Sequence, residues 1–128
     1  MSSSPRYFTL EQANAVTKAI RPILVEIQEI RQVILARQPQ IWPVVAKAAG
    51  NGGSKDASLA AVEFQRLDRL VREIHATGAI LKDINSGLVD FLALHQGREV
   101  YLCWKFGEDQ IEFWHEIDAG FTGRQPLS

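Results

Sequence analysis

The stretch that decides the fold is residues 87–117, which read GLVDFLALHQGREVYLCWKFGEDQIEFWHEI. From Glu99 to Phe106, and again from Ile111 to Ile117, apolar side chains occupy every second position. A period of two is typical of a β-strand with one buried face. Turn signals separate the runs, with a glycine in each of the segments 95–97 and 107–110. The sequence therefore predicts an antiparallel β-sheet over residues 88–117.

The pairing of the last two strands depends on the turn at Glu108 and Asp109. If these two residues form the turn, Leu102 lies opposite His115, and Cys103 projects from the other face of the sheet. We therefore expect one packed face made of alternate residues from both strands: Val100, Leu102, Trp104, Phe106, Ile111, Phe113, His115 and Ile117.

Before residue 87 the apolar rhythm changes to steps of three and four, which predicts helices. The first predicted helix covers residues 9–37, and Thr9 and Gln12 match a capping box at its start. Pro22 lies inside this helix, so we expect a kink there or a division into two helices. The apolar seam of the helix consists of Ala13, Val16, Ile20, Ile23, Ile27, Ile30 and Ile34.

A second helix is predicted over residues 57–85, with Gly87 as the residue that stops it. The connection between the helices is expected to contain a helical turn within residues 41–49. Its glycine cluster at 50–53 lacks the lysine and hydroxyl residue of a phosphate-binding loop. We expect a single domain over residues 1–128.

The predicted fold class is α+β: a long antiparallel helical hairpin followed by a small C-terminal antiparallel β-sheet. Residues 118–128 are expected to be an irregular tail.

Composition narrows the function classes. The chain has 128 residues, of which 46% are apolar and 23% charged, and its 14 basic and 15 acidic residues leave a net charge of -1. No overall positive field attracts nucleic acid or an anionic membrane, so we expect neither partner. A single cysteine, no visible secretory signal and no long apolar run predict a cytoplasmic protein.

The chain contains several specific motifs, with the strongest in its C-terminal third. They are Tyr7–Asn14, Leu81–Asp83, Gly87–Phe91, Gly97–Trp104, Gly107-Glu108, Trp114–Glu116 and Gly120–Leu127. These motifs resemble a bacterial family known as domain of unknown function 2203. The resemblance covers most of the chain, but it implies no activity, substrate or cofactor.

Six polar residues are the candidates for ligand binding. Two readings compete for them: a cleft in which carboxylates and a histidine act as acid and base, and ion pairs that fix turns and the tail. We favour ion pairs, Asp90 with Arg98 or Glu116 with Arg124. The two arginines could also clamp a carboxylate or phosphate. The candidates are Asp90, Arg98, Glu108, His115, Glu116 and Arg124.

The metal ligand types in this region form no convincing site. Glu112 and His115 have the spacing of helical di-iron motifs, but the motif occurs once, and on a strand residues three apart face opposite sides. We therefore predict no metal site. We expect His115 to donate to a backbone carbonyl or a nearby carboxylate, and Cys103, on the face opposite His115, to be structural.

These observations favour a non-enzymatic interaction or ligand-binding module that self-associates through its helical seams as a homodimer. A small ligand is possible, and no cofactor can be named. The alternative is a small enzyme or metal-binding protein with a carboxylate and histidine site in its C-terminal third.

Overall fold

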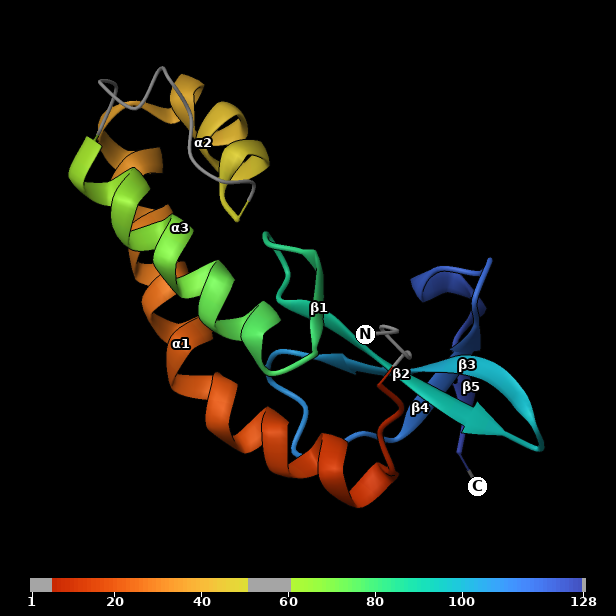
Figure 1. Cartoon of the computed structure of the whole chain (residues 1–128). Helices are drawn as coiled ribbons and strands as arrows, with labels where there is room; N and C mark the ends of the chain where they lie inside the picture. The colour runs from red at the N-terminus through yellow and green to blue at the C-terminus, as the bar shows by residue number, and fades with distance from the viewer. Residues whose placement is uncertain (1–5, 51–60, 128) are drawn as a thin grey trace, which may run out of the picture.

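The computed structural model describes residues 6–50 and 61–127 and shows helices followed by an antiparallel sheet (Figure 1). This confirms the α+β class. Within the described residues the strands follow the order β1-β2-β3-β4-β5, each antiparallel to its neighbours. The elements are α1 (Leu10–Arg37), η1 (Pro39–Ile41), α2 (Trp42–Ala48), α3 (Ala61–Ala76), β1 (Ile80–Asp83), β2 (Leu88–His95), β3 (Arg98–Lys105), β4 (Phe113–Glu116), η2 (Phe121–Gly123) and β5 (Gln125–Pro126).

Helix α1 begins and ends close to the predicted residues. The capping box is confirmed: the Thr9 hydroxyl accepts from the Gln12 backbone N–H, and the Gln12 side chain accepts from the Thr9 N–H, both at 3.0 Å. Of the two alternatives predicted at Pro22, the division is wrong, because α1 continues through it as one helix, and the kink stays a prediction. Pro22 is exposed, so its ring faces solvent and does not disturb the packed side of the helix.

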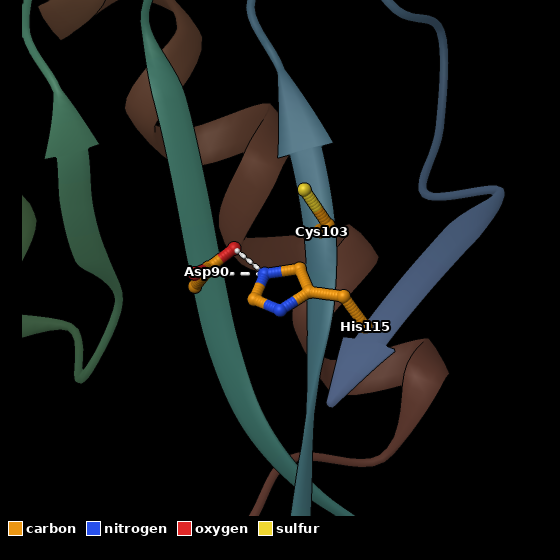
Figure 2. Close-up of side chains that lie close together, drawn as sticks. All are labelled: Asp90, Cys103 and His115. Carbon is orange, nitrogen blue, oxygen red and sulfur yellow. Dashed lines mark hydrogen bonds and ion pairs between the residues drawn. The ribbon is translucent and has the colours of Figure 1, made fainter. Parts of the chain in front are cut away.

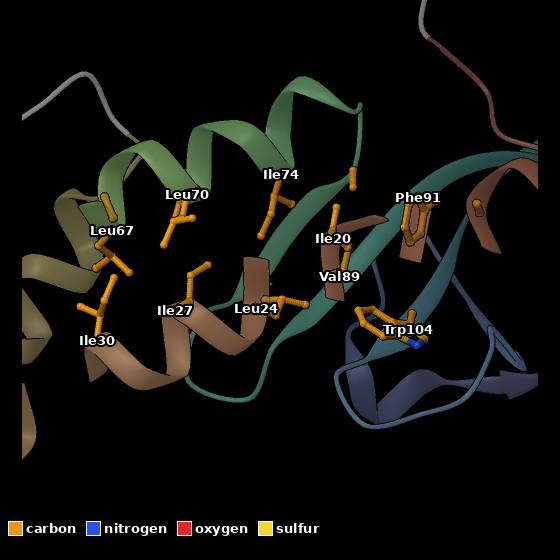
Figure 3. Packing of buried hydrophobic residues seen from close by; sticks show 14 of the residues in the cluster. Ile20, Leu24, Ile27, Ile30, Leu67, Leu70, Ile74, Val89, Phe91 and Trp104 are labelled. Atoms are coloured by element: carbon orange, nitrogen blue, oxygen red, sulfur yellow. The ribbon is translucent and has the colours of Figure 1, made fainter. Parts of the chain in front are cut away.

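The buried stripe of α1 is shifted from the predicted seam in the first half of the helix, and it contacts two surfaces. Its middle, at Ile20 and Leu24, packs on the sheet, and its later turns pack on α3 (Figure 3). Thr17 and Leu24 are buried, whereas the seam residues Val16 and Ile23 are only partly buried. α1 and α3 lie side by side and run in opposite directions (Figure 1).

The prediction of a second helix over residues 57–85 is wrong at its end. Helix α3 stops at Ala76, and residues 80–83 form strand β1 instead. Gly78 has a φ of 93°, a left-handed conformation that ends the helix. The first residues of the predicted helix, 57–60, and most of the glycine cluster lie outside the described part. The helical turn expected within 41–49 is confirmed as α2.

The predicted register of the last two strands is wrong by one residue. Cys103 lies opposite Phe113, Leu102 opposite Trp114, and Tyr101 opposite His115. A shift of one residue turns the whole strand over, so His115 projects from the same face as Cys103.

The shift has a physical cause in the connection 106–112, which is longer than a two-residue turn. The indole N–H of Trp104 donates to the Glu108 carbonyl at 3.0 Å. The Ile111 N–H donates to the Asn14 side chain on α1 at 2.8 Å. Ile111 is therefore fixed against the helix and does not extend β4.

Helix α1 covers one face of the sheet, and the N-terminal segment covers part of one edge. Val89, Phe91 and Trp104 are buried on the face that α1 covers (Figure 3). Beyond the end of β1, the free edge of β2 is covered by the N-terminal segment, where the Phe8 N–H donates to the Leu92 carbonyl at 2.8 Å. No helix in the described part combines the length and hydrophobicity that crossing a membrane requires.

The prediction of an irregular tail over residues 118–128 is wrong in part. The segment contains η2, and β5 pairs with β4 through Pro126 opposite Phe113 and Gln125 opposite Trp114. The C-terminal segment is therefore attached to the sheet.

Candidate functional site

Three polar side chains from neighbouring strands lie close together on one face of the sheet: Asp90 of β2, Cys103 of β3 and His115 of β4 (Figure 2). One ligand-type atom from each lies within 4.8 Å of the other two. The residues are 1%, 0% and 3% exposed. Burying polar groups costs free energy unless they are paired, so the stability of the cluster depends on its hydrogen bonds and charges.

The strand register explains how the three residues meet. Asp90 lies directly opposite Cys103, and His115 lies opposite Tyr101, two residues from Cys103 on the same face. The imidazole of His115 then reaches across β3 to Asp90 on β2 (Figure 2). The Tyr101 ring, 5.5 Å from the imidazole between centroids, forms one wall of the cluster.

The hydrogen bonds of His115 fix the orientation of its ring. Nδ1 lies 2.8 Å from the Glu116 carbonyl, and a carbonyl can only accept, so Nδ1 carries a proton. Nε2 lies 3.1 Å from both carboxylate oxygens of Asp90. An imidazolium paired with a carboxylate and a neutral imidazole paired with a carboxylic acid both fit this geometry, and each pair has no net charge. The expectation that His115 donates to a carbonyl or a carboxylate is confirmed at the carbonyl.

Cys103 completes the cluster as a protonated thiol. Burial, followed by the negative charge of Asp90, raises the pKa of Cys103 to about 12, although Arg124 acts in the opposite direction. A thiol with this pKa holds its proton at neutral pH, and it is the thiolate that attacks or binds metal. The Cys103 thiol can therefore attack a substrate or bind a metal ion only after it has lost its proton.

The structure divides the six predicted ligand-binding residues into three pairs. Asp90 pairs with His115, Glu108 with Arg124 at 2.8 Å, and Arg98 with Glu116 at 2.8 Å. The favoured pairings of Asp90 with Arg98 and of Glu116 with Arg124 are wrong. Arg98 lies opposite His95, five residues along β2 from Asp90, so these two side chains cannot pair. Because β4 is turned over relative to the predicted register, His115 and not Glu116 shares the face on which Arg124 lies.

Only one of the two arginine pairs lies near the cluster. The Arg98 and Glu116 side chains are 58% and 37% exposed, as in an ordinary surface ion pair. Arg124 instead donates to the Cys103 carbonyl at 3.3 Å, and its guanidinium lies over the Phe113 ring at 4.1 Å. Arg124 therefore covers the face of the sheet from which Cys103 projects.

Sequence reasoning missed the grouping of Cys103 with His115. The spacing of the two residues gives no signal, because the strand pairing decides which face each one takes. One signal was present: Asp90 interrupts the apolar run of residues 88–94, and a charged residue there needs a buried partner. Glu112 is exposed, which removes it from the cluster.

Comparison with protein families places residues 6–127 in the family described as "Uncharacterized conserved protein (DUF2203)". No curated protein and no solved structure matches the chain.

Proposed function

Since the chain belongs to the DUF2203 family of uncharacterized conserved proteins, we propose its function from its own buried cluster: it binds one divalent transition-metal ion, with zinc the best fit, through Asp90, Cys103 and His115. The observation that carries the proposal is the meeting of a carboxylate, a thiol and an imidazole from three strands within 4.8 Å.

The ligand types support zinc or a similar ion. Zinc takes sulfur, nitrogen and oxygen ligands at roughly 2.0–2.3 Å, which separates ligand atoms around one ion by roughly 3–4 Å. The atoms of the cluster need only a small contraction to reach that spacing. Three protein ligands leave a fourth coordination position, which a water molecule can fill.

The orientation of His115 supports the same reading. A histidine that binds metal usually donates its other ring N–H to a carboxylate or a backbone carbonyl, which fixes the ring. In His115 the Nδ1–H has this bond to the Glu116 carbonyl, and Nε2 is the nitrogen that faces Asp90 (Figure 2).

Charge balance favours a divalent ion at this depth. A carboxylate, a thiolate and a neutral imidazole carry two negative charges, which a divalent ion neutralises. Binding displaces the proton of the Cys103 thiol and the proton shared by His115 and Asp90. The buried cluster would then be neutral, as a site with at most 3% exposure requires.

Metal content of purified protein tests the proposal. After dialysis against excess zinc and then buffer, we expect about one zinc ion per chain by elemental analysis. With cobalt in place of zinc, a thiolate-to-metal absorption band is expected. Cys103→Ser should abolish the band, and His115→Gln should weaken zinc binding at least about tenfold.

Two variants serve as matched controls. Glu112→Gln removes an exposed carboxylate next to β4, and Arg98→Gln removes a surface charge on β3. Both should bind zinc like the wild type. Equal zinc content in the wild type and in Cys103→Ser would contradict the proposal, because the ion would then be held elsewhere.

A further inference from the structure

The C-terminal segment runs beside β4 at the edge of the sheet, and its Arg124 side chain reaches the face that holds the cluster. We define residues 117–127 as the C-terminal strap; it contains η2 and β5. Its Arg124 bonds to the Cys103 carbonyl and lies over Phe113, which is the residue directly opposite Cys103 in the register. Since residues directly opposite each other share a face, Arg124 lies on the face from which the Cys103 thiol projects.

The attachment of the strap is concentrated at a few contacts. Strand β5 pairs with β4 at only two positions, and the Leu127 N–H donates to the Glu112 carbonyl at 2.9 Å. Ile117 and Phe121 are each 43% exposed. Segments with few buried contacts open locally at low free-energy cost, so the strap is a candidate for movement.

One ion pair fastens the strap to the connection that follows β3. Arg124 Nη2 lies 2.8 and 3.0 Å from the two carboxylate oxygens of Glu108. Glu108 is itself fixed, because its carboxylate accepts from the Lys105 N–H at 2.7 Å. The two side chains are 12% and 28% exposed, so solvent screens this pair less than a surface pair.

The Arg124 guanidinium is not fully satisfied in this position. It lies between the rings of Phe113 and Phe121, at 4.1 and 4.7 Å from their centroids. Its Nε is buried and has no hydrogen-bond partner among the described residues. An unpaired buried donor weakens the closed arrangement, since water would satisfy it when the strap opens.

We propose that the C-terminal strap is the gate of the Asp90, Cys103 and His115 cluster: the Glu108–Arg124 pair holds it closed, and its opening gives the metal ion its way in and out. The role of the ion rests on the proposed function. The opening of the strap does not depend on the proposed function, because access of a reagent to the Cys103 thiol reports it directly. A cluster with 0–3% exposure cannot exchange a hydrated ion unless something covering it moves.

Alkylation of Cys103 under native conditions tests the gate. It is the only cysteine of the chain, so the modified fraction reports one site. When opening is fast compared with the reaction, the rate follows the population of the open form. Glu108→Gln weakens the charge-assisted bonds to Arg124, and we expect alkylation to become at least about tenfold faster.

The matched control is Arg98→Gln, which breaks an ion pair of the same 2.8 Å length outside the strap. It should label like the wild type. Arg124→Gln adds a second test. This variant removes the strap's own side chain from the Glu108–Arg124 pair, so it should also label faster than the wild type.

Two results would overturn the gate. The first is an alkylation rate of Cys103 in Glu108→Gln equal to that of the wild type. The second is a faster alkylation rate that is fully explained by a drop in global stability, measured by melting. If Glu108→Gln does not fold, hydrogen exchange in the wild type tests whether the strap opens. The Leu127 amide should then exchange by local opening, well before the β3 amides. Exchange of Leu127 only on global unfolding would refute the gate.

Metal kinetics separate this inference from the proposed function. Faster cobalt uptake in Glu108→Gln, followed by the thiolate absorption band, supports both. Faster alkylation in a protein that binds no metal supports the gate and refutes the proposed function. Metal binding with unchanged uptake and labelling rates supports the function and refutes the gate.

Discussion

At the scale of single residues, Cys103 determines how stability depends on alkaline pH. Its thiol pKa rises from 9.0 to about 12 on folding, with burial as the largest cause. A raised pKa means that the folded chain holds the proton more tightly than the unfolded chain. The resulting stabilisation is complete below pH 9 and is lost as the pH rises toward 12.

We therefore predict that the free energy of unfolding of the wild type falls between pH 9 and 11. Between the two pKa values the slope is about 1.4 kcal/mol per pH unit. Cys103→Ser should remove this slope, because serine does not ionise in the range. Urea unfolding of both proteins at several pH values measures it, and parallel curves would show that Cys103 does not cause the loss.

The same residues show how far sequence reasoning reaches. The type of partner that His115 binds could be predicted, because a buried imidazole must satisfy its nitrogens. Which residues surround it could not. That depends on the length of the 106–112 connection, which Asn14 sets from the other end of the chain by binding the Ile111 N–H. Local alternation contains no trace of that bond.

At the scale of elements, two glycines account for the wrong prediction of where the second helix ends. The pattern of threes and fours continues past Ala76, but Gly78 ends α3 and β1 follows. Gly87 does not stop a helix; it forms the β1–β2 turn with a φ of 73°. A Cβ built on Gly87 would lie 2.6 Å from the Phe106 Cβ. Only the folded backbone reveals this close approach.

Gly87→Ala should accordingly be among the costly substitutions. We expect a loss of about 2–4 kcal/mol, which combines a left-handed alanine with a clash against a Cβ that cannot move aside. Gly97→Ala is the matched control, with a φ of 78° and nothing within 4 Å of the built Cβ. It should lose only about 1 kcal/mol. Urea denaturation compares the two, and equal losses would mean that the contact with Phe106 has no effect.

At the scale of the whole molecule, the helices and the sheet share one core. Residues of α1, α3, β2 and β3 pack together in it, including Ile27, Leu70 and Phe91 (Figure 3). The α+β class followed from the change of rhythm along the chain. The strands β1 and β5 could not be predicted in this way, because strands of four and two residues are too short to show alternation.

Self-association stays a prediction, and the structure changes which face it would need. Most of the α1 seam is buried within the chain, with Ile20 and Ile27 at 0% exposure. A dimer formed through the helices would have to use the exposed side of α1, where Val25 and Val33 are 44% and 40% exposed. Light scattering after size exclusion should then give a dimer mass, and Val25→Glu with Val33→Glu should return the monomer. A monomer mass for the wild type at high concentration would rule the dimer out.

The edges of the sheet have a consequence for solubility. A free strand edge can template the addition of another chain and start aggregation. Here the outer strand β5 has only two residues, one of them Pro126, which has no N–H to offer an incoming strand. At the opposite edge, β1 is short, and Phe8 occupies the adjoining stretch of β2. Within the described residues, the sheet thus presents little continuous edge on which amyloid-type stacking could begin.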